Sequence, residues 1–189
     1  MAAYTPSLQQ NLGFWSALGM VKPGSLEETV QSLWQTIIVE WFPARDGYKY
    51  GFKAATLANR NQPDISVIQI NALVPNPRNS NHFDERQILL VECKRPSLDT
   101  PRSWNDTLAG QLHDDLAQNI NSSNRLFGAV AIGKKVKFYQ FDGNARQDHQ
   151  VSELHHGTFD MGDPNGVTQV ERMMDYIKSN GWRWACSPV

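Results

Sequence analysis

The chain has 189 residues, of which 40% are hydrophobic, and its formal net charge is −1. A chain of this length suits one compact domain that buries about 70% of the surface exposed by its unfolded form. The near-neutral charge excludes a strongly basic DNA-coating protein and an acidic tail protein, although it leaves room for a local basic surface.

Targeting and redox signals are weak throughout the sequence. No apolar run reaches the roughly 18 residues of a membrane-spanning helix, so we expect no membrane partner. Residues 1–16 lack the charged and apolar regions of a secretory signal, which predicts an intracellular protein of the cytoplasm or nucleus without a signal peptide. Cys93 and Cys186 are too few for a disulfide framework or a zinc site by themselves.

The sequence divides into an N-terminal arm and one domain. Residues 1–24 end at a Lys-Pro-Gly turn signal and are expected to pack on the domain as an arm. Ser25 and Glu28 fit a capping box, and the apolar spacing that follows predicts a helix over about 26–41. The domain is predicted to span 25–189, with a core over about 25–141 and a C-terminal extension over 142–189.

The remaining elements are read from hydrophobic periodicity. The run Ile88–Val91 is apolar on both faces, which is typical of a central strand that is buried on both sides. The order helix, three strands, helix, two strands and a last helix indicates an α/β fold with a mixed sheet flanked by helices. The predicted strands are 48–57, 65–70, 87–94, 126–132 and 136–141, and the later helices are 104–121 and 167 to about 181.

Three charged residues lie where two of these strands meet. Glu92 and Lys94 alternate along one strand and therefore share a face, whereas the side chain of Cys93 points into the core. Asp64 begins the neighbouring strand, so pairing of the two strands would bring it near Glu92. Two adjacent carboxylates suit a hard cation such as Mg²⁺, and a lysine beside them can orient an attacking water. The pattern predicts metal-assisted phosphodiester hydrolysis.

These residues resemble a known signature. Pro63-Asp64 followed by Glu92-Cys93-Lys94 is similar to the PD-(D/E)XK motif of the restriction-endonuclease-like nuclease superfamily. The predicted order of elements over about 25–141 is similar to the core of that superfamily, which runs helix, three strands, helix, strand. The resemblance implies that Asp64, Glu92 and the backbone carbonyl of Cys93 bind Mg²⁺ or Mn²⁺, and that Lys94 positions the water.

The resemblance also suggests two further site residues. Many members carry a glutamate on the first core helix, a position matched by Glu28 or Glu27. Some members carry a glutamine on the helix after the signature lysine, where this chain has Gln111. Those members have a tyrosine four residues later, whereas this chain has Asp115.

Structural alternatives exist for each of these residues. Asp64 could serve only as a turn residue, and Glu92 and Lys94 could form a surface pair on an edge strand. The capping-box role alone accounts for Glu28, and Gln111 could lie on a solvated helix face. The leading prediction is nonetheless a Mg²⁺- or Mn²⁺-dependent nuclease, which the resemblance implies leaves a 5′-phosphate. The alternative is a catalytically inactive module of the same fold that binds nucleic acid or protein, in an effector-like or regulatory role.

A local excess of basic residues fits a nucleic-acid partner, either DNA or RNA. Residues 45–137 contain 13 Lys+Arg and 9 Asp+Glu, although a solvated charged surface would look the same. The sequence leaves the oligomeric state open, a homodimer included. The basic residues around the candidate site are Arg45, Lys49, Lys53, Arg60, Arg95, Arg102, Lys134, Lys135 and Lys137.

Overall fold

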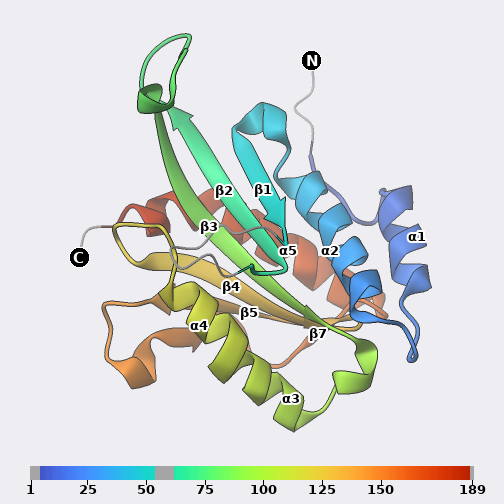
Figure 1. The fold of residues 1–189 in the computed structure, drawn as a ribbon. Coiled ribbons are helices and arrows are strands. Elements are labelled where there is room, and N and C mark those ends of the chain that lie inside the picture. Colours follow the sequence, from blue (N-terminus) through green and yellow to red (C-terminus); the bar gives the residue numbers. More distant parts are fainter. Residues whose placement is uncertain (1–4, 54–61, 188–189) are drawn as a thin grey trace.

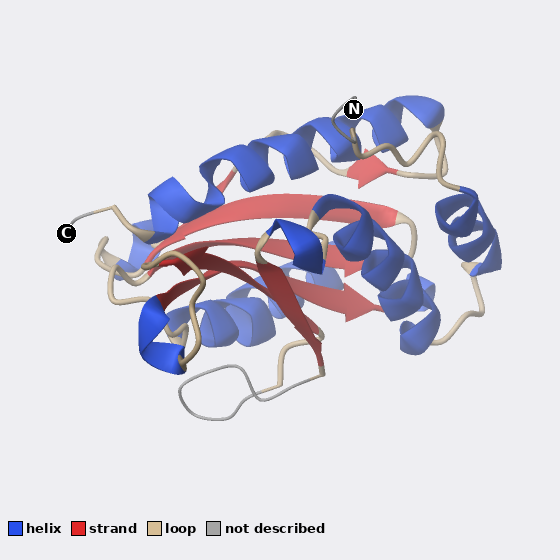
Figure 2. Ribbon diagram, turned by 90° about the horizontal axis from the view of Figure 1, so that it is seen from above, coloured by secondary structure: helices blue, strands red, loops and turns tan. Residues whose placement is uncertain are grey.

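A mixed β-sheet with helices on both faces forms the centre of the molecule (Figures 1 and 2). The structure, a computed structural model, describes residues 5–53 and 62–187. The predicted α/β class with a mixed sheet, flanking helices and a C-terminal helix is therefore confirmed.

The sheet has seven strands in the described part of the chain, six of them in the order β1-β2-β3-β4-β5-β6, with β7 pairing β5. All neighbouring strands are antiparallel except β3 and β4, which are parallel and joined by a helical crossover. The strands are β1 (Tyr48–Phe52), β2 (Ile65–Ala72), β3 (Phe83–Lys94), β4 (Arg125–Ile132), β5 (Lys135–Asp142), β6 (Val151–Glu153) and β7 (Phe159–Asp160).

Two helical layers cover the sheet. The helices α1 (Leu12–Met20), α2 (Glu27–Trp41) and α5 (Pro164–Ala185) share one apolar cluster with one face. The segments α3 (Pro101–Asp106), η4 (Thr107–Leu112) and α4 (His113–Ala117) run on without a break and cover the other face. Short 3₁₀ turns complete the chain at η1 (Ala44–Asp46), η2 (Ser80–His82), η3 (Pro96–Leu98) and η5 (Gln147–His149).

Strand β3 lies between the two helical layers because its side chains are apolar on both faces. Leu89, Val91 and Cys93 pack in the cluster with α2 and α5, whereas Leu90 packs against Leu112 of η4. This double burial confirms the prediction of a central strand. It also sends Glu92, two residues after Leu90, to the face covered by η4 and α4.

The N-terminal region differs from the prediction in two details. The predicted arm contains α1, and its backbone is fixed by acidic side chains, since the amide of Leu8 donates to Glu171 over 2.7 Å. The predicted capping box is wrong. Leu26 is the N-cap of α2, and its apolar side chain makes no capping bond. The Ser25 hydroxyl does not cap the helix, since it accepts from the Lys22 amide and donates to the Met20 carbonyl.

The predicted strands are confirmed, except that the first ends at Phe52 rather than continuing through Lys53, and its residues 54–57 lie outside the described residues. The polar segment after residue 142 contains two short strands, β6 and β7, that the prediction missed. The last helix does not end near Gly181 but continues to Ala185. A Cβ at Gly181 would lie 3.0 Å from the Ile88 Cβ, so this glycine serves close packing of α5 on β3 rather than a helix end.

The helix predicted over 104–121 ends at Ala117 and contains a π-helical segment, η4. Leu108, Leu112 and Leu116 recur at a strict spacing of four, which exceeds the 3.6 residues of an α-helical turn. A π turn takes up this excess, so the stripe stays on one face. Ile120, predicted to extend the stripe, lies beyond the helix and is exposed.

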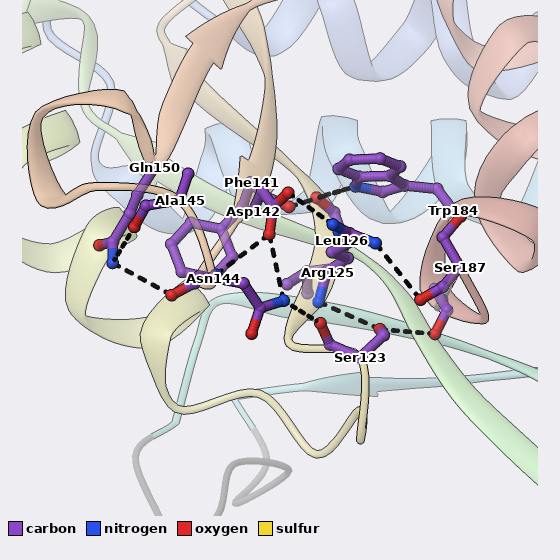
Figure 3. A network of polar contacts seen from close by, with 12 residues as sticks. Ser123, Arg125, Leu126, Phe141, Asp142, Asn144, Ala145, Gln150, Trp184 and Ser187 are labelled. Carbon is purple, nitrogen blue, oxygen red and sulfur yellow. Dashed lines mark hydrogen bonds and ion pairs between the residues drawn. The ribbon is translucent and has the colours of Figure 1, made fainter. Parts of the chain in front are cut away.

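A polar network attaches the end of α5 to the start of β4 (Figure 3). The Trp184 indole N–H donates to the carbonyls of Leu126 and Phe141 over 3.3 and 3.2 Å. The Arg125 guanidinium pairs with Asp142 over 2.9 Å and lies 5.0 Å from the Trp184 ring centroid. These contacts fix the C-terminal helix to the central strands.

No helix among the described residues is long and apolar enough to span a membrane.

Candidate active site

The candidate site lies at one end of the sheet, where β3 stops and β2 starts. Because β2 and β3 are antiparallel and Ile65 faces Val91, the residues just before β2 lie beside the last residues of β3. This register brings Asp64 next to the Glu92–Lys94 segment, as the sequence predicted. The first turn of α2 and the segment η4 reach the same end, as the contacts below show.

Asp64 is buried and held by two hydrogen bonds. Its Oδ1 accepts from the Gln31 amide of α2 over 2.7 Å, and its Oδ2 accepts from the backbone N–H of Cys93 over 2.8 Å. The residue is only 6% exposed. Because both partners are donors from packed elements, the carboxylate has a fixed orientation rather than the mobility of a turn residue.

Glu92 is a fully buried carboxyl group. Among the described residues, no N–H or hydroxyl group donates to either of its oxygens. Burial, the charge of Asp64 and the neighbouring Asp115 carboxyl together raise the pKa of Glu92 to about 10, against the opposing effect of Lys94. Without a cation the group is therefore protonated at neutral pH.

Lys94 stands at the mouth of this acidic cluster. Its ammonium donates to the Gln111 side-chain carbonyl over 2.7 Å and lies 3.8 Å from Glu27 and 3.9 Å from Glu92. Its side chain is 16% exposed, so it faces both the carboxylates and solvent. This position suits a group that orients a water molecule entering from solvent.

Of the two adjacent glutamates on α2, only Glu27 faces the site. Successive residues of an α-helix point about 100° apart, so the two side chains diverge. Glu27 is near Lys94, and partial burial raises its pKa, which the charges of Lys94 and Lys53 oppose. Glu28 is exposed on a surface shared with Met20 of α1. The structure therefore does not bring Glu28 into the site. Glu27 instead takes the position near Lys94 that the sequence analysis had assigned first to Glu28.

The crossover helix contributes two polar groups. Gln111, from the π-helical segment, contacts Lys94, and Asp115, 4% exposed in α4, contacts Glu92. The sequence analysis named Gln111, but it treated Asp115 only as a departure from the family pattern. It also missed Gln31. The spacing of four that separates Glu27 from Gln31, and Gln111 from Asp115, places each pair on one helix face and could have signalled both.

The donor set fits a hard divalent cation. Asp64 and Glu92 supply carboxylate oxygens, and Glu92 is buried without a donor. In a strand, the N–H and C=O of one residue point the same way, so the Cys93 carbonyl points with its N–H toward the Asp64 side. The Cys93 side chain lies in the core, and its burial raises the pKa of the thiol, so the sulfur stays neutral. Mg²⁺ commonly takes one or two carboxylates and fills its other positions with water.

A larger protein-only metal site is absent from the described chain. Between residues 5 and 187, apart from 54–61, no group of three or more His, Cys, Asp or Glu side chains is arranged to hold a metal ion. Any cation here would therefore depend on two carboxylates, a carbonyl and water or substrate oxygens.

Comparison with family models, curated proteins and solved structures finds no match to the chain.

Proposed function

We propose that the chain is a nuclease that uses Mg²⁺ or Mn²⁺ to hydrolyse phosphodiester bonds of DNA or RNA. The observation that carries the proposal is the charge balance at the end of β3. The carboxyl groups of Glu27 and Glu92 lie 3.8 and 3.9 Å from the Lys94 ammonium, and those of Asp64 and Asp115 are close enough to Glu92 to raise its pKa. Such a cluster favours a divalent cation that would neutralise it and displace the proton of Glu92.

Each residue has a separate role in the proposed reaction. Asp64 and Glu92, with the Cys93 carbonyl, would hold the cation, which when bound neutralises phosphate charge and lowers the pKa of a coordinated water. Lys94 directs the attacking water and offsets the charge that develops on the phosphate. Gln111 fixes the direction of the Lys94 ammonium, and Gln31 fixes Asp64.

The resemblance to the PD-(D/E)XK superfamily supports the proposal. The described chain has the order helix, three strands, helix and strand over α2 to β4, with the motif residues at the junction of β2 and β3. A structural pair on an edge strand would not need this arrangement. The segment is central instead, because β3 lies between β2 and β4.

The direct test is cleavage of end-labelled single- and double-stranded DNA and RNA with Mg²⁺, with Mn²⁺ and with EDTA. Asp64→Asn, Glu92→Gln and Lys94→Ala should each abolish metal-dependent cleavage. Glu85→Gln, which neutralises an exposed ion pair at the other end of β3, is the matched control and should remain active. Circular dichroism checks that each variant folds. Undiminished cleavage by all three site variants would contradict the proposal.

A second candidate is a non-catalytic binding module of the same fold. The observation in its favour is that both oxygens of Asp64 already accept hydrogen bonds within the protein. Calorimetric titration with Mn²⁺, carried out with and without an oligonucleotide, separates the two candidates. The nuclease should bind the ion and lose binding in Glu92→Gln, whereas the module should bind none.

A further inference from the structure

Four cations without an ion-pair partner surround the candidate site. Among the described residues, none of them forms an ion pair, although Lys53 is close enough to Glu27 to lower its pKa. The four are Lys22 between α1 and α2, Lys53 after β1, Arg95 after β3 and Lys134 between β4 and β5.

Sheet topology explains why these residues gather at one end. β1 and β3 are both antiparallel to β2, and β4 is parallel to β3. The C-terminal ends of β1, β3 and β4 therefore all lie at the same end of the sheet. Lys53 and Arg95 directly follow two of these ends, and Lys134 lies in the turn after the third. The turn between α1 and α2 adds Lys22, which the sequence analysis did not include among the basic residues.

Two of the cations line one groove beside the site. A cavity of about 350 Å³ is formed by Val21, Lys22, Pro23, Pro96 and Lys134. The wall of the groove is tied to the catalytic strand, because the Gly133 N–H donates to the Lys94 carbonyl over 3.0 Å. Gly133 has φ +60 and would place a Cβ 3.1 Å from Pro96, so this turn requires glycine to reach the loop after β3.

Three cations away from the candidate site are compensated by carboxylates. Lys49 lies 2.6 Å from Glu85, Arg86 lies 2.7 Å from Asp84, and Lys178 lies 3.9 Å from Asp46. Within the described chain, each of these three cations therefore has a carboxylate partner, unlike the four at the site end. An anionic partner would find both the positive groups and the candidate catalytic residues at that end.

We propose that the groove of Lys22 and Lys134 binds the phosphodiester backbone of a nucleic-acid strand and leads it to Lys94, with Arg95 and Lys53 along the same path. The inference rests on the proposed function and adds to it a route for the substrate. The two lysines in the lining would each contact a phosphate, while Pro23 and Pro96 offer apolar contact to the sugars. Because these groups contact the backbone and not the bases, binding is independent of sequence.

The test compares two doubly substituted proteins that lose the same charge. Lys22→Ala/Lys134→Ala removes the groove cations, and Lys49→Ala/Lys178→Ala removes two compensated cations away from the candidate site. Each full-length protein is titrated into a fluorescein-labelled DNA strand of about 20 nucleotides, in EDTA to prevent cleavage, and anisotropy is recorded between about 50 and 200 mM salt. Thermal unfolding checks that both variants are folded.

The groove variant should bind at least about fivefold more weakly than the wild type, because it loses two phosphate contacts. Its plot of log K against log salt should be shallower by about 1.4, since each contact to a single strand contributes about 0.7. The compensated variant should match the wild type in both quantities. Equal affinity and slope for the two variants would overturn the inference, as would a wild type that does not bind the strand.

Cleavage assays on the same proteins separate this inference from the nuclease proposal. Binding that depends on Lys22 and Lys134, without cleavage by any metal, would retain the groove and reject the nuclease. Metal-dependent cleavage by a groove variant that binds like the wild type would retain the nuclease and reject the groove.

Discussion

Gln31 Nε2 donates a hydrogen bond to Asp64 Oδ1 over 2.7 Å, which joins the middle of α2 to the start of β2. Both residues are buried, at 6% exposure each. A carboxylate that binds a cation must present its oxygens in a fixed direction, and groups behind the ligands commonly provide that direction. Gln31 is in this sense a positioning residue for the candidate site.

Replacement of Gln31 by alanine should lower Mg²⁺ affinity and cleavage by about 10- to 100-fold, because Asp64 loses its side-chain donor. The measurement is cleavage rate as a function of Mg²⁺ concentration, in which the half-saturating concentration should rise. Gln35→Ala, one turn later on the same helix, is the control and should leave the curve unchanged. A purely structural Gln31 would lower stability without moving the metal curve.

The adjacent glutamates of α2 should differ sharply. Glu27→Gln removes a charge 3.8 Å from the Lys94 ammonium and should lower the cleavage rate by about tenfold. Glu28→Gln changes only an exposed side chain and should have no effect. Steady-state kinetics of the two variants decides the matter, and a larger loss in Glu28→Gln would contradict the assigned geometry.

Gln111 should affect the rate through Lys94. Gln111→Ala removes the acceptor 2.7 Å from the ammonium, so Lys94 becomes mobile and kcat should fall by about tenfold with little change in KM. Gln118→Ala, which loses only a bond to the Asp114 carbonyl, serves as the control. An unchanged kcat in Gln111→Ala would show that Lys94 is positioned without it.

Stability should depend on pH through Glu92. Its pKa is raised from the usual 4.5 to about 10, so the folded protein holds a proton that the unfolded chain releases between these values. The contribution is fully present below about pH 4.5 and is lost as the pH rises through about 10. Without metal, the free energy of unfolding should therefore fall as the pH rises within this window, by at most about 1.4 kcal/mol per pH unit.

Glu92→Gln should flatten this dependence, because glutamine does not titrate. Urea unfolding in EDTA at several pH values between 6 and about 9 measures the slope for both proteins. Identical slopes would mean that Glu92 is ionised in the folded protein. Saturating Mg²⁺ should also reduce the slope of the wild type, since the cation replaces the proton.

The network at the end of α5 should contribute to stability and not to activity. Trp184→Phe removes the indole donor to two strand carbonyls and weakens the contact with Arg125, at a cost of about 1–2 kcal/mol. Trp15→Phe loses a single exposed bond to the Gln9 carbonyl and should cost less than about 0.5 kcal/mol. Urea unfolding midpoints of the two variants provide the comparison.

Local patterns in the sequence were sufficient to predict the main strands and the shared face of Glu92 and Lys94. The apolar run before Glu92 predicts a central strand because both faces must be buried, and strand alternation then fixes the shared face of Glu92 and Lys94. The prediction that Asp64 approaches Glu92 required only that the two strands pair, and the structure shows that they pair antiparallel, with Ile65 opposite Val91. These inferences need only neighbours in the chain and one strand register.

The remaining features depend on contacts between distant segments. The spacing of four from Glu27 places Gln31 on the same helix face, but only the packing of α2 on the sheet brings Gln31 against Asp64. Asp115 reaches Glu92 because the crossover helix covers that face of the sheet. Ser25 has the composition of an N-cap, yet the preceding turn recruits its hydroxyl. Strands β6 and β7 are too short and polar to show a period, and they are defined by backbone pairing with β5.

The π-helical turn Thr107–Leu112 makes this part of the chain intolerant of insertions and deletions. Loss of one residue before Gln111 would rotate all that follows by about 100° relative to Trp104. Gln111 and Asp115 would then turn together away from Lys94 and Glu92. The length of the crossover helix is thereby coupled to the geometry of the candidate site, whereas the exposed turn between β2 and β3, at the far end of the sheet, is free to change length.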